Sequence, residues 1–211
     1  YRCTHEKSQD YWSQSVSNGG AIGIYLCGNG NTIVEQNEVF ECDRGIGLCS
    51  ESYKLQTKDC IVRDNFVYNN FRTGIYMGAY LGFDGLSTKN CYVVNNTLFN
   101  NNLKGGQLDG TNNYLKVNDR DNSSEGEIRL SELCEGNVIA NNIIYAVSDR
   151  DIFIRKYTTS GKNNYIGGNI YFSPTKKNHK WIWDGKEYTD FSAWQAVSGD
   201  KTSVFDVDPL L

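Results

Sequence analysis

The stretch Asn95-Asn-Thr-Leu-Phe-Asn-Asn101 contains the unit that decides the fold. In this unit, an asparagine is followed by two strand-forming residues and then by an aromatic residue. The unit recurs with the same spacing after Asn37, Asn65, Asn142 and Asn169. A β-branched residue also stands three positions before each of these asparagines, from Val34 in the first copy to Ile166 in the last. Because the register is shared on both sides, the chain is predicted to consist of structural repeats.

A second strand pattern lies between the asparagines. It begins with a small or acidic residue and alternates with period two, so that one isoleucine of each copy is expected to face the core; these are Ile24, Ile46, Ile75, Ile128 and Ile152. The asparagines are 28, 31, 46 and 27 residues apart, which leaves room for one wide coil per repeat. The hexapeptide period of left-handed β-helices is absent. The sequence therefore predicts an all-β fold, a right-handed parallel β-helix.

The asparagines are interpreted as a structural ladder rather than as ligand contacts. Parallel coils stack ~4.8 Å apart, which brings equivalent side chains of neighbouring coils into columns. In such a column each side-chain amide can donate to one neighbour and accept from the other. Asparagine also tolerates the backbone of a tight turn.

The sequence at each end of the chain predicts how the β-helix begins and ends. Tyr1-Arg-Cys3 matches Phe40-Glu-Cys42, so we expect the chain to begin within a repeat, with further coils upstream. Near the other end, Asp190 is a potential N-cap and Gly199 a potential C-terminal stop, and the apolar spacing between them predicts a short amphipathic helix that packs through Phe191, Trp194 and Val197. The expected organisation is β-helix coils over residues 1–174 and a C-terminal cap over residues 175–211.

The composition limits the partners. Charged residues make up 22% of the chain and the formal net charge is −4, which gives no indication of a nucleic-acid surface or of an anionic membrane partner. The longest apolar runs fall far short of the ~20 residues that cross a bilayer, so no membrane span is expected. The sequence does not indicate an oligomeric state.

The repeats resemble those of the secreted, pectate-lyase-like right-handed β-helix proteins of bacteria, which are largely carbohydrate-active. The resemblance covers nearly the whole chain and includes Asn141-Asn-Ile-Ile-Tyr145 and the closing segment from Trp181 to Leu211. It implies a polysaccharide partner and a secreted or cell-surface location. The Asp-Pro-His-Asp motif of mannuronan epimerases and the paired motifs of polygalacturonases are absent, which disfavours those activities.

The outward positions of the isoleucine strands suggest a sugar-binding surface. One predicted column contains Tyr25, Gly47, Tyr76, Arg129 and Phe153, and the next contains Cys27, Cys49, Gly78, Ser131 and Arg155. Aromatic rings stack on sugar C–H faces, and guanidinium groups donate to hydroxyls or carboxylates. The predicted substrate-binding residues are Tyr25, Tyr76, Tyr80 and Arg155. Ordinary cross-strand pairing on an exposed sheet would explain the same columns.

The candidate catalytic residues are Glu51, Glu127 and Arg129. A glycosidase needs two carboxyl groups about 5–9.5 Å apart, and neighbouring coils could supply that spacing. However, Glu51 follows its strand whereas Glu127 precedes its own, which could separate the two side chains by more than ~15 Å. A lyase would instead use Arg129, Arg155 or Tyr76 as the base that removes a proton next to a uronate carboxylate. Both carboxylates could also be solvated rim charges.

No specific motif in the sequence predicts a cofactor or a metal site. Asp119, Asp121, Asn122 and Glu125 could hold Ca²⁺, although oxygen-rich loops of this kind are more often simply polar. Among the seven cysteines, three pairs occupy matching places in adjacent coils: Cys3 with Cys42, Cys27 with Cys49, and Cys60 with Cys91. Adjacent coils permit disulfides at these places, but stacked reduced thiols in the core are an equal alternative.

Two classes of function thus remain open at this stage. The leading hypothesis is a glycan-cleaving enzyme, either a glycoside hydrolase or a polysaccharide lyase, that binds an extended sugar chain along the outer face of the helix. The alternative is a non-catalytic glycan-binding or structural surface module of the tailspike or adhesin kind. A third possibility places the catalytic residues in upstream coils.

Overall fold

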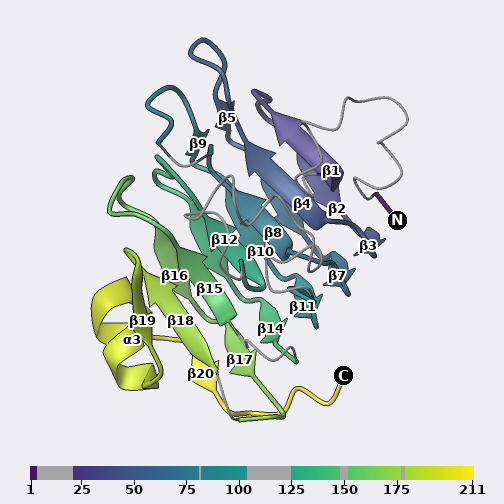
Figure 1. The fold of residues 1–211 in the computed structure, drawn as a ribbon, viewed down its shortest axis with the longest axis vertical. Helices are drawn as coiled ribbons and strands as arrows, with labels where there is room; N and C mark the ends of the chain where they lie inside the picture. The colour runs from purple at the N-terminus through teal and green to yellow at the C-terminus, as the bar shows by residue number, and fades with distance from the viewer. Residues whose placement is uncertain (4–20, 81, 104–124, 148–151, 177–178) are drawn as a thin grey trace, which may run out of the picture.

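The computed structural model describes residues 1–3, 21–80, 82–103, 125–147, 152–176 and 179–211. Within these residues, three sheets run along the axis of a solenoid (Figure 1). Each coil passes through one strand of sheet I, then sheet II, then sheet III, and neighbouring coils pair in parallel. The predicted parallel β-helix is therefore confirmed.

Sheet I contains the longest strands, and two sheets with short strands complete each coil. The strands of sheet I are β1 (Ile22–Cys27), β4 (Arg44–Cys49), β8 (Thr73–Met77), β12 (Ile128–Leu130), β15 (Ile152–Lys156), β18 (Lys180–Trp183) and β19 (Lys186–Tyr188). Those of sheet II are β2 (Ile33–Glu35), β6 (Ile61–Arg63), β10 (Tyr92–Val94), β13 (Val138–Ala140) and β16 (Tyr165–Gly167). Those of sheet III are β3 (Glu38–Phe40), β7 (Phe66–Tyr68), β11 (Thr97–Phe99), β14 (Ile143–Tyr145), β17 (Ile170–Phe172) and β20 (Val204–Phe205). A small extra sheet joins β5 (Thr57–Lys58) to β9 (Thr88–Lys89).

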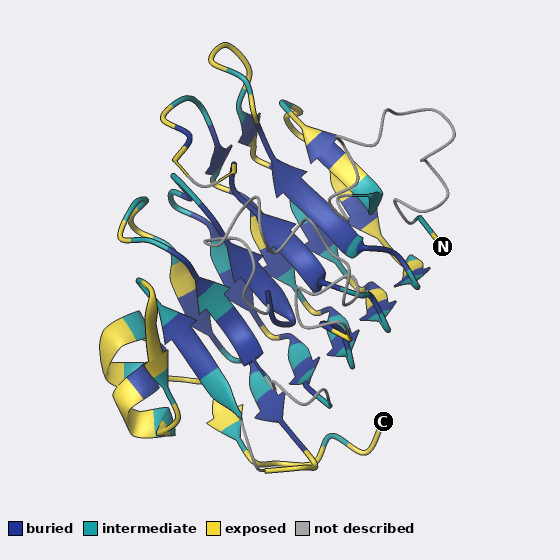
Figure 2. Cartoon of the chain, viewed as in Figure 1, coloured by how far each residue is buried: buried dark blue, intermediate teal, exposed yellow. Residues whose placement is uncertain are grey.

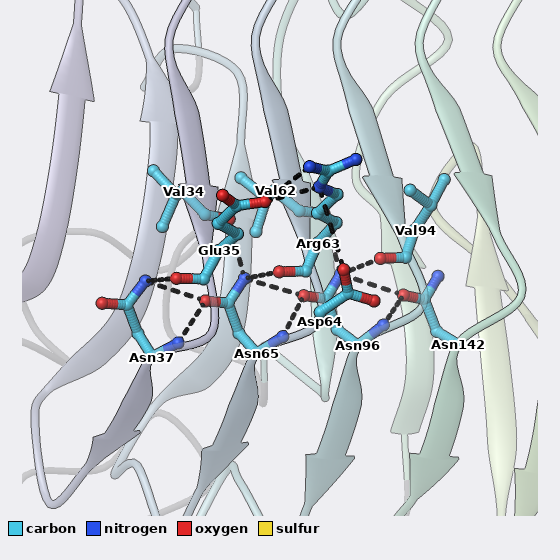
Figure 3. A network of polar contacts seen from close by, with 10 residues as sticks. All are labelled: Val34, Glu35, Asn37, Val62, Arg63, Asp64, Asn65, Val94, Asn96 and Asn142. Carbon is cyan, nitrogen blue, oxygen red and sulfur yellow. Dashed lines mark hydrogen bonds and ion pairs between the residues drawn. The ribbon is translucent and has the colours of Figure 1, made fainter.

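The predicted asparagine ladder lies at the corner between sheets II and III (Figure 3). Each side-chain amide donates to the side-chain oxygen of the next asparagine at 2.9–3.1 Å, from Asn37 through to Asn169. The central members also donate to main-chain carbonyls, as Asn96 does to Val62 and Val94. The residue before each ladder asparagine has a left-handed backbone, for example Asp64 with φ 55°. The ladder thus satisfies the polar groups that each sharp corner leaves without strand partners.

The core consists largely of aliphatic side chains from the strands of the three long sheets. Ile46, Ile75 and Ile128 are fully buried, as the period-two pattern predicts. The prediction fails in the next coil, because Ile154 rather than Ile152 pairs with Ile128. Phe153 is also a core residue, although alternation from Ile154 would turn it outward, and the pairing of β15 with β18 shifts register between Ile152 and Arg155. Arg155 takes the place beside Arg129 that was predicted for Phe153.

An aromatic cluster closes the C-terminal end of the core. Helix α3 (Phe191–Ser198) is capped by the Asp190 side chain and ends at Gly199 with φ 76°, as predicted. Trp194 of this helix is fully buried and stacks on Trp181 at 5.8 Å, whereas Val197 is exposed, contrary to the predicted apolar stripe. The region expected to be a cap also contributes β18 and β20 to sheets I and III.

All seven cysteines are free thiols. The three aligned pairs therefore form no disulfides, and Cys42, Cys60 and Cys91 belong to the hydrophobic core. No helix in the described part of the chain has the length and apolar character of a membrane span.

Candidate functional site

The outer face of sheet I is hollowed by a cavity of about 330 Å³. It is lined by Ile22 and Tyr25 of β1, Arg44 of β4, Glu51 in the turn after β4, and Tyr76 of β8. Three of these residues, Tyr25, Tyr76 and Glu51, were predicted from the sequence. The cavity thus combines aromatic rings, a cation and a carboxylate on one surface.

Gly47 lies beneath two of the side chains that line this cavity. Tyr25, Gly47 and Tyr76 are direct neighbours across three parallel strands. A Cβ atom at position 47 would lie 3.0 Å from Cδ2 of Tyr25 and 3.2 Å from Cδ1 of Ile22, closer than ordinary van der Waals contacts. The absence of a side chain at position 47 therefore lets Tyr25 and Ile22 pack closely over the strand beside Tyr76.

Arg44 is held in place by a buried ion-pair cluster beside the cavity. Its Nε and Nη2 donate to the two carboxylate oxygens of Glu125 at 3.1 and 3.0 Å. Arg72 and Arg129 also donate to Glu125, the latter at 2.7 Å. The Glu125 side chain is completely buried and those of Arg72 and Arg129 nearly so, whereas 12% of the Arg44 side chain is exposed. Arg44 therefore presents the cationic edge of this cluster to the cavity.

The electrostatics of the cluster are dominated by its cations. Burial alone would raise the pKa of Glu125, but Arg129, Arg44 and Arg72 together hold it well below its usual range. Burial and the repulsion of Arg44 lower the pKa of Arg72 to about 10. Glu125 is consequently a permanent anion at neutral pH that fixes the surrounding guanidinium groups.

A row of alternating guanidinium groups and aromatic rings extends from the cavity along sheet I. The Tyr76 ring lies 5.2 Å from the guanidinium carbon of Arg44 and 5.0 Å from that of Arg129. Arg129 is also 4.6 Å from the Tyr157 ring, which Arg155 contacts at 3.9 Å. Figure 2 shows that most of this sheet is buried, and Tyr76 itself is only 5% exposed. Arg129 thus lies in its predicted column, whereas Arg155, predicted in the next column, joins the column of Arg129. Both lie further along the sheet than the cavity.

The remaining wall near Tyr25 contains two cysteines. The Cys49 thiol donates to the Tyr25 hydroxyl at 2.8 Å, and Cys27 is the register neighbour of Cys49. Burial raises the pKa of Cys49 to about 12, so it remains a thiol at neutral pH. Burial also raises the pKa of the Tyr25 and Tyr76 hydroxyls. Both phenols are therefore protonated and can donate hydrogen bonds.

The structure does not bring the other predicted residues into the cavity. Glu127 is buried at the end of a second ladder, where its carboxylate accepts from the main-chain and side-chain nitrogens of Asn101 at 2.9 and 2.6 Å. Asn101 in turn accepts from Asn70. Tyr80 is exposed and contacts Phe83. Glu127 therefore forms part of the packed interior and does not line the cavity with Glu51.

The sequence contains a signal for the cluster that our predictions missed. The signal is the charged residue that stands two positions before the small or acidic residue at the start of each isoleucine pattern. In three successive coils this residue is Asp43, Arg72 and Glu125, so the sign of the charge alternates from coil to coil. Aligning these flanking positions would have placed Arg72 against Glu125.

Of the four predicted Ca²⁺ ligands, Glu125 lies within the described residues. Glu125 is engaged by guanidinium groups, an environment that repels a further cation. Asp119, Asp121 and Asn122 lie outside the described residues. Within the described ranges, no group of three histidine, cysteine or acidic side chains is arranged to hold a metal ion.

The fold and the cavity together define a solenoid protein with a ligand-sized depression on its longest sheet. Residues 13–119 match the model of the right-handed beta helix region, and the chain belongs to this family. It is 30% identical over 193 residues to the uncharacterized protein YwoF of Bacillus subtilis (strain 168), an alignment that includes 90% of this chain and 36% of that protein. The chain thus spans about a third of the length of that relative. No solved structure matches the chain.

Proposed function

We propose that the chain acts on a polysaccharide that lies along the outer face of sheet I, and that it cleaves uronic acid-containing chains by elimination. The observation that carries this proposal is the meeting of Arg44 and Glu51 in one cavity between Tyr25 and Tyr76. Such a cavity can stack sugar rings, bind a sugar carboxylate and remove a proton.

Each step of an elimination has a candidate group in this cavity. Arg44 would bind the uronate carboxylate, since Nη1 has no hydrogen-bond partner among the described residues while Glu125 holds Nε and Nη2. Glu51 would accept the proton on the carbon next to that carboxylate. The electron pair of that C–H bond forms the carbon–carbon double bond as the bond to the glycosidic oxygen breaks, and a tyrosine phenol protonates the leaving oxygen. The phenol then regains a proton from Glu51 through solvent.

Elimination is favoured over hydrolysis because of the number of carboxylates. A glycosidase of the usual kind needs two carboxyl groups about 5–9.5 Å apart. Of the residues that line the cavity, Glu51 is the one with a carboxylate. The nearby Glu125 and Glu127 are engaged by guanidinium groups and by Asn101 respectively.

The test is a screen of the chain against polyuronates and neutral polysaccharides that follows absorbance from unsaturated products together with new reducing ends. We expect both signals with at least one polyuronate, and Glu51→Gln should lower kcat by about 10²–10⁴-fold. Glu35→Gln, which removes an exposed carboxylate on sheet II, is the matched control and should leave kcat unchanged.

Other outcomes identify other functions. Reducing ends without absorbance would indicate hydrolysis and contradict elimination. Binding that Arg44→Gln abolishes, without any product, would indicate the non-catalytic glycan-binding module. A polymeric glycan substrate also implies a secreted or cell-surface location, which fractionation of the source cells with an antibody against the chain would test.

A further inference from the structure

Sheets I and II lie on different sides of each coil (Figure 1). The outer face of sheet II carries an apolar patch. The patch covers three successive coils and is formed by the outward residues of β10, β13 and β16. We define this tyrosine patch as Tyr92, Val94, Val138, Ala140, Tyr165 and Gly167. No member of the patch is charged.

Two exposed aromatic rings dominate the tyrosine patch. Tyr92 is 46% exposed and Tyr165 is 51% exposed. Both residues are register neighbours of Val138, so they lie in one column two coils apart, or roughly 9–10 Å. Large exposed rings at such regular spacing indicate a binding surface more than a packing requirement.

The rings lie beside residues with short side chains. A Cβ atom at Gly167 would lie 2.5 Å from the Tyr165 hydroxyl and 2.8 Å from its Cζ. The Tyr165 ring therefore extends along its own strand across Gly167, with one face towards the sheet and the other towards solvent. In the same column as Gly167, Ala140 and Val94 add small apolar side chains. The result is a level surface rather than a groove.

The border of the tyrosine patch is polar and holds ion pairs in which cations and carboxylates are equal in number: Lys89, Lys162 and Arg63 against Glu135, Glu35 and Asp64. Lys89 lies 3.6 Å from the Glu135 carboxylate, and Lys162 lies 3.9 Å from it. On the side of the first coils, Glu35 and Arg63 form an ion pair at 2.6 Å. An uncharged partner fits this patch best, because the patch has no charged member and the ion pairs at its border balance in charge.

We propose that the tyrosine patch binds an uncharged, extended β-1,4-linked polysaccharide such as cellulose or chitin. In such chains alternate sugars present the same face, so two rings two coils apart can stack on every second sugar. Aromatic faces bind the C–H faces of sugars, while the two hydroxyls donate to the polymer. A second copy of the chain fits less well, since six residues are far fewer than the ~20–30 per side of a stable protein interface.

The experiment is a depletion assay of the 211-residue chain on microcrystalline cellulose and on chitin. We expect binding to at least one solid, with the double variant Tyr92→Ala/Tyr165→Ala lowering the partition coefficient by at least about tenfold. The matched control is Tyr53→Ala, which removes a tyrosine that is 67% exposed on another part of the surface and should bind normally. The ring-preserving variant Tyr92→Phe/Tyr165→Phe should retain most of the binding.

Two results would overturn the proposal: no depletion by either solid, or undiminished depletion by the double alanine variant. If that variant does not fold, the single variants Tyr92→Ala and Tyr165→Ala decide the question in the same assay. An excess of soluble polyuronate should not displace the bound chain, since it would occupy the cavity on sheet I. Displacement would assign the binding to that cavity instead and would also overturn the proposal.

Discussion

Glu125 accepts a hydrogen bond of 2.7 Å from Arg129, four residues further along the chain, although both side chains are almost completely buried. The same carboxylate also pairs with Arg44 and Arg72 from two earlier coils. This cluster connects three successive strands of sheet I and holds Arg44 at the cavity wall.

Replacing Glu125 with glutamine should destabilise the chain strongly. The change leaves buried guanidinium groups without their shared anion, and removing one partner of a buried ion pair costs about 3–5 kcal/mol. Urea unfolding followed by circular dichroism measures the free energy of unfolding. Glu35→Gln, which breaks an exposed ion pair, is the control and should change it little. Equal effects of the two variants would contradict the structural importance of the cluster.

The ionisation of the Glu125 carboxylate should make the stability of the chain depend on pH. Its pKa in the folded chain is held well below the ordinary value of 4.5, so the unfolded chain takes up a proton first as the pH falls. The stabilisation is complete above the unfolded pKa and is lost as the pH falls from there towards the folded pKa. Unfolding free energies between pH 6 and pH 3 should therefore fall less steeply for Glu125→Gln than for the unchanged chain. Parallel curves would refute this assignment.

Interior members of the asparagine ladder should tolerate substitution less well than its first described member. Asn96 is buried, and its Nδ2 donates to the carbonyls of Val62 and Val94 and to Asn142. In Asn96→Asp the donating Nδ2 is replaced by a carboxylate oxygen that faces other acceptors. We expect this change to lower the free energy of unfolding by about 1–3 kcal/mol or more. Asn37→Asp, at a partly exposed position, is the matched control and should cost less. Thermal unfolding of both variants measures the difference.

Adding a side chain at Gly47 should displace Tyr25 and Ile22 and so weaken binding of the proposed glycan without unfolding the chain. Its backbone conformation is accessible to other residues, and the atoms nearest to an added Cβ belong to the movable side chains of Tyr25 and Ile22. We therefore expect Gly47→Val to lower the affinity for a bound oligosaccharide by about tenfold, with a small change in thermal stability. Gly30→Ala adds a methyl group at ordinary contact distances elsewhere and is the control. Isothermal titration calorimetry provides the affinities.

Thiol labelling should distinguish the surface cysteines from those of the core. Cys27 is exposed and Cys3 is partly exposed, whereas the other five are buried. Burial also raises the pKa of Cys91 and Cys134 to about 12, which suppresses the reactive thiolate. Iodoacetamide at pH 8 followed by mass spectrometry should modify Cys27 and Cys3 in the folded chain and all seven in urea. Rapid modification of Cys91 in the folded chain would contradict this arrangement.

The ladder and the strand order were predictable from the sequence because the same side chains recur at the same corner of every coil. Asparagine is favoured there because its side-chain amide donates to one neighbour of the ladder and accepts from the other, and few other side chains can do both. The register of β15 was not predictable from alternation. Ile152, Phe153 and Ile154 are three consecutive apolar residues, so period two fits more than one alignment, and pairing with β12 decides between them.

The cavity could be predicted only in part. Tyr25 and Tyr76 follow from alternation, because outward residues of paired strands share a column. Arg44 was missed because it precedes the alternating segment, and its position depends on a carboxylate 81 residues away in the sequence. Glu127 was misleading because its place in the strand pattern gave no sign that a buried amide, Asn101, engages its carboxylate.

The ladder corner also has a consequence for how this kind of chain can evolve. Successive coils differ in length, since neighbouring ladder asparagines are 27 to 46 residues apart, yet the segment from each sheet II strand to the following sheet III strand keeps the same length throughout. Insertions are therefore accommodated away from this corner, on the paths that lead into and out of sheet I. A gene for such a solenoid can gain or lose loop codons next to the cavity on sheet I, or duplicate a whole coil, while the corner continues to dictate how the copies stack. The loops beside sheet I can thus change in sequence and length while the stacking of the coils stays the same.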